Sequence, residues 1–309
     1  MEKISVIIPV KNEAKKIASC LEAVFSQSYK PYEVIIVDGH SSDDTVKIAK
    51  KYPVRIFYED YKTRGGANQV GIENANGEFI AFTDADCIPK RDWLENLIIE
   101  FREGIVGVGG GIINLGEGIW EKSINLAVGT FLGSANSVQG RFFNEQKFVS
   151  SISGCNSMYR KVDLNRVHGF DVSLGTAEDT ELNNKLLKIG KLLYTPKAIV
   201  LHNHNRGIKD FAKRMHQYGY GRAKSRLFDI QILPPIFIVI LIASIMIAPI
   251  FLIAFFILYF IIIFTTGLLL SFKERQLLYL ISIPVVLLIE HSSYTIGFWR
   301  GLLKINDIR

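Results

Sequence analysis

Two carboxylates one residue apart, Asp84 and Asp86, follow the apolar run Phe79–Phe82. The run predicts a buried strand, and Pro89 marks the start of a helix a few residues later. Carboxylates at positions i and i+2, where a strand gives way to a loop, can both turn toward one point above the sheet edge. There they can hold a hard divalent cation beside phosphate oxygens. Both residues are therefore candidate metal ligands, and an acidic turn that only caps the next helix is the alternative.

Predicted strands and helices alternate through the first third of the chain. The strands are expected at 4–9, 33–38, 55–58 and 79–82, and the helices at 12–27, about 43–51, 65–76 and 91–103. This alternation indicates an α/β fold, with a mostly parallel sheet covered by helices on both faces. The loops after parallel strands meet at one edge, where ligands bind. We expect one crevice there to collect Asp38, either Glu59 or Asp60, Asp84 and Asp86.

A nucleotide is the expected occupant of this crevice. The carboxylate of Asp38 can accept from a base N–H, while the backbone of Gly39–Ser42 curls round the base. Turn chemistry followed by a helix N-cap at Asp43 or Asp44 is the alternative reading of this loop.

Arg64 and Gly65–Gly66 open the next predicted helix, where a guanidinium and free N–H groups can meet a diphosphate. The loop after the first strand reads PVKNEA and has no dinucleotide fingerprint. A nicotinamide enzyme is therefore not expected.

Five segments together resemble the motifs of family 2 glycosyltransferases, inverting enzymes with the GT-A fold. In order, they read SVIIPVKNEAKKI, EVIIVDGHSSDDT, KTRGGANQVGIENANGEFIAFTDAD, GCNSMYRKVDLNRVHGFD and AEDTELNNKLLKIG. The resemblance covers about residues 3–220. Five motifs in register are far more specific than any one of them.

The resemblance implies a role for several residues. Asp38 would bind the base, Asp84 and Asp86 would form the Asp-x-Asp element that meets ribose and Mn²⁺ or Mg²⁺, and Asp179 would be the catalytic base. The other residues expected to bind the nucleotide-sugar are Pro9, Val10, Glu13, Asp60, Arg64, Asn68 and Ala85.

Two departures from the family pattern are visible. The usual Asp-Asp-Gly-Ser reads Asp38-Gly39-His40-Ser41 here, at the loop expected to contact the base. The Gln-x-x-Arg-Trp motif of processive members is absent, which favours transfer of a single sugar.

Glu178 and Asp179 begin a predicted helix, and their chemistry suits the reaction that the resemblance implies. Inversion at an anomeric carbon needs a carboxylate that takes the proton of the acceptor hydroxyl, while a metal and fixed cations stabilise the leaving diphosphate. We expect Asp179 to be this base and Glu178 to orient a neighbour or an acceptor hydroxyl. Favourable charge at a helix N-terminus is the alternative.

Three further residues are candidates on the same resemblance. His202 lies where some GT-A enzymes place a third metal ligand, although a histidine that only ends a strand is the alternative. Gly154 and Asn156 are expected to contact the acceptor. Between the motifs, VGGGII predicts a strand, and 119–138 predicts a helix that covers the active site, touches the bilayer or only packs.

The 309 residues carry a net charge of +6 and only three cysteines, Cys20, Cys87 and Cys155. The cysteines are far apart and form no paired motif, which suits a reducing compartment and argues against structural zinc. Basic residues gather before the long apolar run, which favours anchoring to anionic membrane lipid over a nucleic-acid groove. These residues are Lys209, Lys213, Arg214, Arg222, Lys224 and Arg226.

No charged residue or histidine occurs from Ile232 to Phe272. As a helix this run would be about 60 Å long, enough for two crossings of a ~30 Å hydrocarbon core. We expect a hairpin turning near Ala248–Pro249. A third apolar segment, about 276–299, carries Glu290 and His291 and favours an interfacial or re-entrant helix over a third span.

The expected organisation is thus a cytoplasmic catalytic domain, 1–228, and a membrane domain, 229–309, of a multi-pass protein in the cell membrane. The N-terminal apolar run is too short for a signal peptide. The expected activity is transfer of one sugar from a nucleotide-sugar, with a UDP-sugar as the expected donor, to a lipid-linked or glycan acceptor.

Two other classes are alternatives. A sugar-nucleotide synthase would open with a glycine-rich loop and an activating cation, which PVKNEA lacks. A transporter with a nucleotide-binding head would carry most of its residues in the membrane, whereas most of this chain precedes the first apolar run.

Overall fold

A computed structural model of the chain describes residues 2–135, 137–203, 207–226, 232–236, 239–240 and 249–305. These residues form two compact units. The first comprises Met1–Asn114 and Ser137–Asn203, and the second comprises Leu115–Asn136 and His204–Arg309. The expected boundary near residue 228 and most of the first expected crossing, about 232–248, lie outside the described residues.

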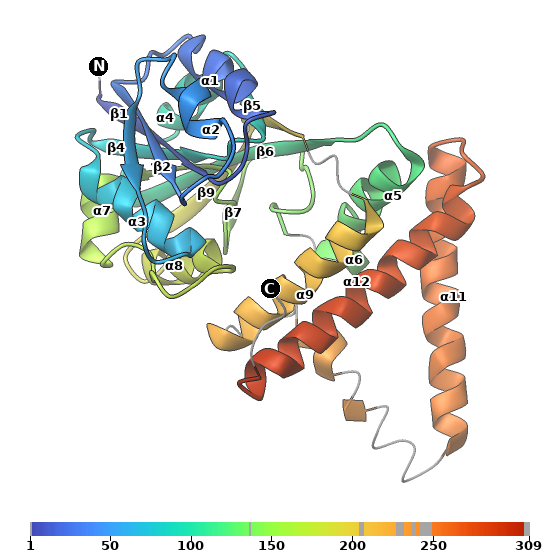
Figure 1. The fold of residues 1–309 in the computed structure, drawn as a ribbon. Helices are drawn as coiled ribbons and strands as arrows, with labels where there is room; N and C mark the ends of the chain where they lie inside the picture. Colours follow the sequence, from blue (N-terminus) through green and yellow to red (C-terminus); the bar gives the residue numbers. More distant parts are fainter. Residues whose placement is uncertain are drawn as a thin grey trace. The chain divides into compact units, whose positions relative to one another are not determined.

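The first unit is built on one nine-stranded sheet with the order β3-β2-β1-β4-β8-β6-β9-β5, and β7 pairs with β9 (Figure 1). Four strands are parallel neighbours: β1 (Ile4–Val10), β2 (Glu33–Asp38), β3 (Arg55–Tyr58) and β4 (Phe79–Thr83). The others are β5 (Cys87–Pro89), β6 (Ile105–Leu115), β7 (Lys147–Val149), β8 (Asn156–Arg160) and β9 (Lys191–Asn203). The pairs β4–β8, β6–β8, β5–β9 and β7–β9 are antiparallel.

Helices cover both faces of this sheet, which confirms the predicted α/β class. One face packs on α1 (Ile17–Phe25), α2 (Thr45–Ala49) and α4 (Trp93–Ile98). The opposite face packs on α3 (Arg64–Asn74), α7 (Lys161–Arg166) and α8 (Glu178–Leu186). Successive strand side chains point to opposite faces, so Ile8 of β1 joins the first core and Ile7 joins the second.

The predicted helix at 12–27 is wrong at its start, because α1 begins at Ile17. The backbone N–H of Asn12 donates to Ser41 Oγ at 2.8 Å, and that of Glu13 donates to Thr45 Oγ1 at 2.8 Å. Asn12 also has a φ of 57°, which helices do not contain. The first residues after β1 are therefore bound to the loop after β2 and do not begin the helix.

In the second unit, the helix predicted at 119–138 divides into α5 (Ile119–Val128) and α6 (Phe131–Ser134). The hydroxyl of Thr130 accepts from the backbone N–H of Gly133 at 3.2 Å and so caps a new helix. The hydroxyls of Ser123 on α5 and Ser282 on α12 (Tyr279–Leu302) lie 2.7 Å apart.

Helix α9 (Ile208–Lys224) packs closely along α12. A Cβ atom on Gly219 would lie 2.0 Å from the backbone oxygen of Tyr294, and one on Gly297 would lie 1.9 Å from that of His216. Only glycine fits at these two positions, which let the helix backbones approach each other.

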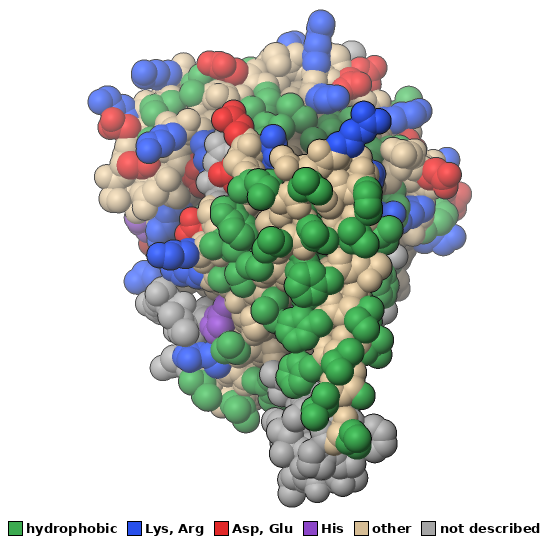
Figure 2. Space-filling view, turned by 90° about the vertical axis from the view of Figure 1, so that its right-hand side faces the viewer, with side chains coloured by type: hydrophobic (Ala, Val, Ile, Leu, Met, Phe, Trp, Pro, Cys, Tyr) green, Lys and Arg blue, Asp and Glu red, His purple; other side chains and the backbone are tan. Residues whose placement is uncertain are grey.

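Two described helices are long and apolar enough to cross a membrane, judged by length and composition: Ile253–Lys273, within α11 (Pro249–Lys273), and α12. Figure 2 shows hydrophobic side chains gathered along α11. The largest of its exposed side chains include Ile253, Phe256, Ile257, Leu258, Phe260, Ile261, Phe264, Leu269 and Phe272. On α12, Glu290 is buried, and the ring nitrogens of His291 lie 3.0 Å from Tyr259 Oη and 3.0 Å from the backbone oxygen of Leu132.

Candidate active site

The predicted metal ligands come together at the end of β4. The backbone N–H of Cys87 donates to the Asp84 carbonyl at 3.0 Å, which forms a tight turn between β4 and β5. Cys87 is paired with His202 in the β5–β9 register, and His202 Nε2 lies 3.2 Å from Asp86 Oδ1. One ligand atom from each of Asp84, Asp86 and His202 lies within 4.8 Å of the others. Two carboxylates and an imidazole are a suitable donor set for Mn²⁺, and the carboxylates also suit Mg²⁺.

Two fixed cations face these carboxylates. Lys16 Nζ lies 3.7 Å from Asp86 Oδ2 and 3.9 Å from Glu13 Oε2. Arg64 pairs with Asp84, and its Nε lies 3.9 Å from Glu178 Oε1. Burial lowers the pKa of Arg64, but the charges of Asp84 and Glu178 outweigh it and raise that pKa overall. The guanidinium is therefore a permanent positive charge between the two acidic pairs.

The same negative field raises the pKa values of two neighbouring groups. Burial, followed by the charge of Asp86, raises the pKa of Glu13. Burial alone would lower the pKa of His202, but its hydrogen bond to Asp86 and the nearby carboxylates raise it overall.

Asp179 is a partly buried carboxylate that accepts three N–H donors. Its Oδ2 accepts from the Gly154 backbone N–H at 3.2 Å and from Gln139 Nε2 at 3.1 Å, and its Oδ1 accepts from the Thr180 backbone N–H at 2.7 Å. Burial raises the pKa of Asp179 overall, although the backbone N–H donors of Gly154 and Thr180 oppose this shift. Donors of this kind stabilise the ionised carboxylate.

Glu178 is in a different state. Burial and the charge of Asp179 raise the pKa of Glu178 to about 8, although Arg64 lowers it. Burial therefore raises the pKa of both carboxyls, that of Glu178 to about 8, and the two titrate as a pair. The two carboxyls also differ in their partners, since Asp179 accepts from N–H groups and Glu178 faces Arg64, which suits a base beside a positioning group.

The loop after β2 closes onto Asp38. This buried carboxylate accepts from the Ser41 backbone N–H at 2.9 Å and from Ser41 Oγ at 2.6 Å. Pro9 and Val10 pair with Val37 and Asp38 in the β1–β2 register, so they end at the same sheet edge.

Asn68 is buried on α3, and no described residue hydrogen-bonds its Oδ1. Ala85, also buried, lies between Asp84 and Asp86.

Of the two acids considered at the end of β3, Glu59 is buried and accepts from the Lys62 backbone N–H at 2.8 Å. Asp60 is 93% exposed and bonds to His40 at 2.8 Å. The structure thus places Glu59 inside the fold and Asp60 in solvent.

The two expected acceptor residues differ in their surroundings. Gly154 lies against Asp179 through its N–H. Asn156 is fully buried: its Nδ2 donates to the carbonyls of Gly111 and Ala198, each at 2.9 Å, and its Oδ1 accepts from Trp93 Nε1 at 2.8 Å. These bonds engage both ends of the Asn156 amide within the core.

Sequence reasoning missed two residues of this site. Lys16 follows Glu13 by one helical turn, which is a weak signal for a shared position. Gln139 lies in the stretch between the recognised motifs, and no spacing in the sequence connects it to Asp179.

The fold and the geometry of this site define a GT-A-type glycosyltransferase. The chain belongs to glycosyltransferase family 2, because the family profile described as "Glycosyl transferase family 2" matches residues 5–167. The predicted resemblance is thus confirmed.

Individual relatives agree with this assignment. The chain is 32% identical over 326 residues to the dolichyl N-acetyl-alpha-D-glucosaminyl phosphate 3-beta-D-2,3-diacetamido-2,3-dideoxy-beta-D-glucuronosyltransferase of Methanococcus voltae, covering 99% of each chain. It is 41% identical over 118 residues to the glycosyltransferase AglE of Haloferax volcanii, covering 35% of this chain and 39% of the relative. Among solved structures, the mannosyltransferase PcManGT of Pyrobaculum calidifontis with GDP-Man and Mn²⁺ has a TM-score of 0.65 at 16% identity, covering 99% of this chain and 88% of that one.

Proposed function

We propose that this glycosyltransferase is a metal-dependent, inverting enzyme of the membrane that transfers one sugar from a UDP-sugar to a dolichyl-phosphate-linked acceptor. The observation that carries the proposal is the convergence of Asp84, Asp86 and His202 near the Glu178–Asp179 pair, with Arg64 contacting both Asp84 and Glu178. The Methanococcus voltae relative, similar over its whole length, has a name that describes transfer to a dolichyl-linked sugar phosphate.

The donor would lie along the edge where β1, β2 and β4 end. Asp38, Pro9 and Val10 would contact the nucleoside, while Arg64, Asn68 and Glu13 would line the path to the diphosphate. Asp84, Asp86 and His202 would hold Mn²⁺ or Mg²⁺, which supplies positive charge to the leaving diphosphate when bound. Lys16 and Arg64 add fixed positive charge within reach of the same carboxylates.

In the chemical step, Asp179 would take the proton of the acceptor hydroxyl as that oxygen forms a bond to the anomeric carbon. The bond from this carbon to the diphosphate breaks on the opposite side, its electron pair leaves with the diphosphate, and the configuration inverts. The N–H groups of Gly154 and Gln139 fix the direction in which Asp179 Oδ2 points. Glu178, protonated, would orient the acceptor or Arg64.

The second unit would hold the protein at the bilayer, with the catalytic residues on the cytoplasmic side. Helices α11 and α12 contain the two described stretches that are long and apolar enough to cross a membrane. Lys209, Lys213 and Lys224 are exposed on α9, whereas Arg222 is buried. The exposed lysines suit contact with anionic lipid, and a membrane-bound enzyme meets lipid-linked acceptors at high local concentration.

The test uses the full chain in detergent with labelled UDP-sugars or GDP-mannose and a dolichyl-phosphate-linked acceptor, with and without Mn²⁺. We expect transfer from a UDP-sugar, only with the metal, and with inverted anomeric configuration in the product. Equal transfer in EDTA would reject metal dependence. Equal use of a water-soluble glycan would reject the lipid-linked acceptor, and retention of configuration would reject the role of Asp179.

A further inference from the structure

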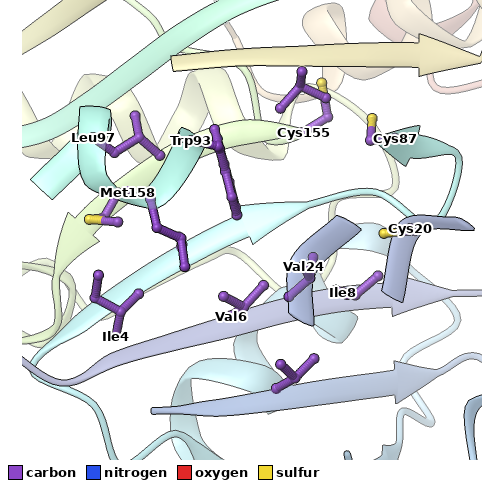
Figure 3. Close-up of a cluster of buried hydrophobic side chains, with 14 of the residues drawn as sticks. Ile4, Val6, Ile8, Cys20, Val24, Cys87, Trp93, Leu97, Cys155 and Met158 are labelled. Atoms are coloured by element: carbon purple, nitrogen blue, oxygen red, sulfur yellow. The ribbon is translucent and has the colours of Figure 1, made fainter. Parts of the chain in front are cut away.

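The fold brings Cys87, Cys155 and His202 together, although they are far apart in the sequence. All three are buried, and one ligand atom from each, sulfur or imidazole nitrogen, lies within 4.8 Å of the others. Figure 3 shows Cys87 and Cys155 at one end of the core that also holds Trp93 and Met158. Both cysteines are free thiols.

Three different elements position this cluster, which we name the thiol cluster. Cys87 and His202 face each other in the β5–β9 register. Cys155 directly precedes β8, and its thiol lies 3.3 Å from Ser153 Oγ. Because the ligands come from paired strands and a short connection, their separation depends on the sheet and not on one mobile loop.

Two thiols and an imidazole are the donors that Zn²⁺ and Cd²⁺ prefer, whereas Mn²⁺ and Mg²⁺ prefer oxygen. Sulfurs bound to one tetrahedral zinc at 2.3 Å stand about 3.7 Å apart. The ligand atoms of Cys87, Cys155 and His202 lie within 4.8 Å of one another, so small side-chain rotations would bring them to this geometry. The spacing of the cysteines gives no zinc motif in the sequence, and the donor set exists only in the folded chain.

We propose that the thiol cluster is a second metal site, specific for thiophilic divalent cations, and that filling it inhibits the enzyme by removing His202 from Asp86. On binding, each thiol releases its proton to water and donates a thiolate electron pair, and the neutral imidazole donates its lone pair. His202 Nε2 now lies 3.2 Å from Asp86 Oδ1, and this nitrogen cannot bind a metal in the thiol cluster and remain at Asp86.

The cluster also adjoins the proposed base. Cys155 follows Gly154, whose N–H donates to Asp179 at 3.2 Å. A metal that draws Cys155 toward Cys87 therefore moves the backbone that orients Asp179. The effect on turnover rests on the proposed function, but metal binding by the cluster does not.

The binding test titrates Cd²⁺ into the full-length protein in detergent, with a phosphine reductant, and follows the ultraviolet thiolate-to-cadmium charge-transfer band. We expect one Cd²⁺ per chain, with the band strongly reduced in Cys87→Ser and in Cys155→Ser. Cys20→Ser is the matched control, because Cys20 is also buried and free, and its thiol donates to the Asp84 carbonyl at 3.3 Å. It should keep the native band.

Circular dichroism identifies any variant that fails to fold. If one of the two serine variants does not fold, the other alone is enough to test the loss of the band. Absence of the band in the native protein, its persistence in the folded serine variants, or an equal loss in Cys20→Ser would overturn the proposal.

The activity test measures inhibition by Zn²⁺ at fixed Mn²⁺, relative to the uninhibited rate of each variant. We expect Cys155→Ser to require at least about tenfold more Zn²⁺ for half inhibition, since losing even a group that only supports a metal ligand typically costs about 10–100-fold in affinity. Rising Mn²⁺ should weaken the inhibition of the native protein. Equal sensitivity of the native protein and Cys155→Ser would place zinc at the Asp84–Asp86 pair and reject the inhibitory role.

Discussion

The backbone N–H of Gly154 donates to Oδ2 of Asp179 at 3.2 Å, and so it links the connection before β8 to the first turn of α8. This bond stabilises the carboxylate form of Asp179. It does not protonate the carboxylate, which can still take the proton of the acceptor hydroxyl. Gly154, expected from the sequence to contact the acceptor, thereby also positions the group proposed to deprotonate it.

Asp179→Asn should lower transfer by about 10²–10⁴ while donor and metal affinities stay nearly native, because an amide keeps the size of the carboxylate but cannot take a proton. Calorimetry of nucleotide binding, beside turnover on one acceptor, separates these quantities. Glu178→Gln is the paired variant. Loss of turnover in Glu178→Gln but not in Asp179→Asn would assign the base to the other carboxyl.

Asp38→Asn should raise the KM for the donor and change the chemical step less, because the nucleoside pocket contacts the ground state and the transition state alike. Its bonds to the N–H and hydroxyl of Ser41 are those of a carboxylate acceptor. Steady-state kinetics with varied donor check this. A fall in kcat at unchanged KM would refute a binding role.

Asp86→Ala should reduce transfer by about 10³ or more, and EDTA should do the same to the native protein, since both remove charge that stabilises the leaving diphosphate. Added Mn²⁺ should restore the EDTA-treated enzyme but not the variant. Asp44→Ala is a control, because Asp44 is exposed and pairs only with Lys47 at 3.7 Å among the described residues. Its rate should match the native rate.

Stability should depend on the protonation of Glu178. Burial raises its pKa from 4.5 to about 8, so between these values the folded state binds a proton that the unfolded chain releases. The contribution of Glu178 to the free energy of unfolding is thus complete below 4.5 and declines as the pH rises toward 8. Glu178→Gln should flatten this decline, measured as urea midpoints in EDTA at several pH values. An identical slope in both proteins would count against the buried, protonated Glu178.

Gly297→Val should destabilise the second unit by about 1–3 kcal/mol or more, because its side chain would overlap the backbone of α9 at His216. The melting temperature should fall, while nucleotide binding to the first unit is retained at lower temperature. Gly175→Ala is the control, since no atom lies within 4 Å of the added Cβ. Unchanged melting of Gly297→Val would show that the helices can separate at little cost.

The parallel half of the sheet was predictable, because each strand is an apolar run followed by a helical pattern. The convergence of Asp84 and Asp86 followed from their spacing after β4. The late start of α1 was not predictable, since the segment after β1 bonds to a loop that lies about 30 residues later in the chain. Likewise, the contact of Gln139 with Asp179 depends on packing between distant segments, and no local periodicity encodes it.

The antiparallel pairing of Cys87 with His202 carries a consequence for changes in chain length. Side chains alternate across a strand, so a shift of β9 by one residue against β5 would turn His202 to the other face and bring Leu201 or Asn203 opposite Cys87, depending on the direction of the shift. A single deletion between the start of β9 and His202, which brings Asn203 opposite Cys87, can therefore leave a folded first unit that has lost one ligand from each candidate metal cluster. Alignment-guided grafting of this site onto another scaffold succeeds only if this one strand register is transplanted with it.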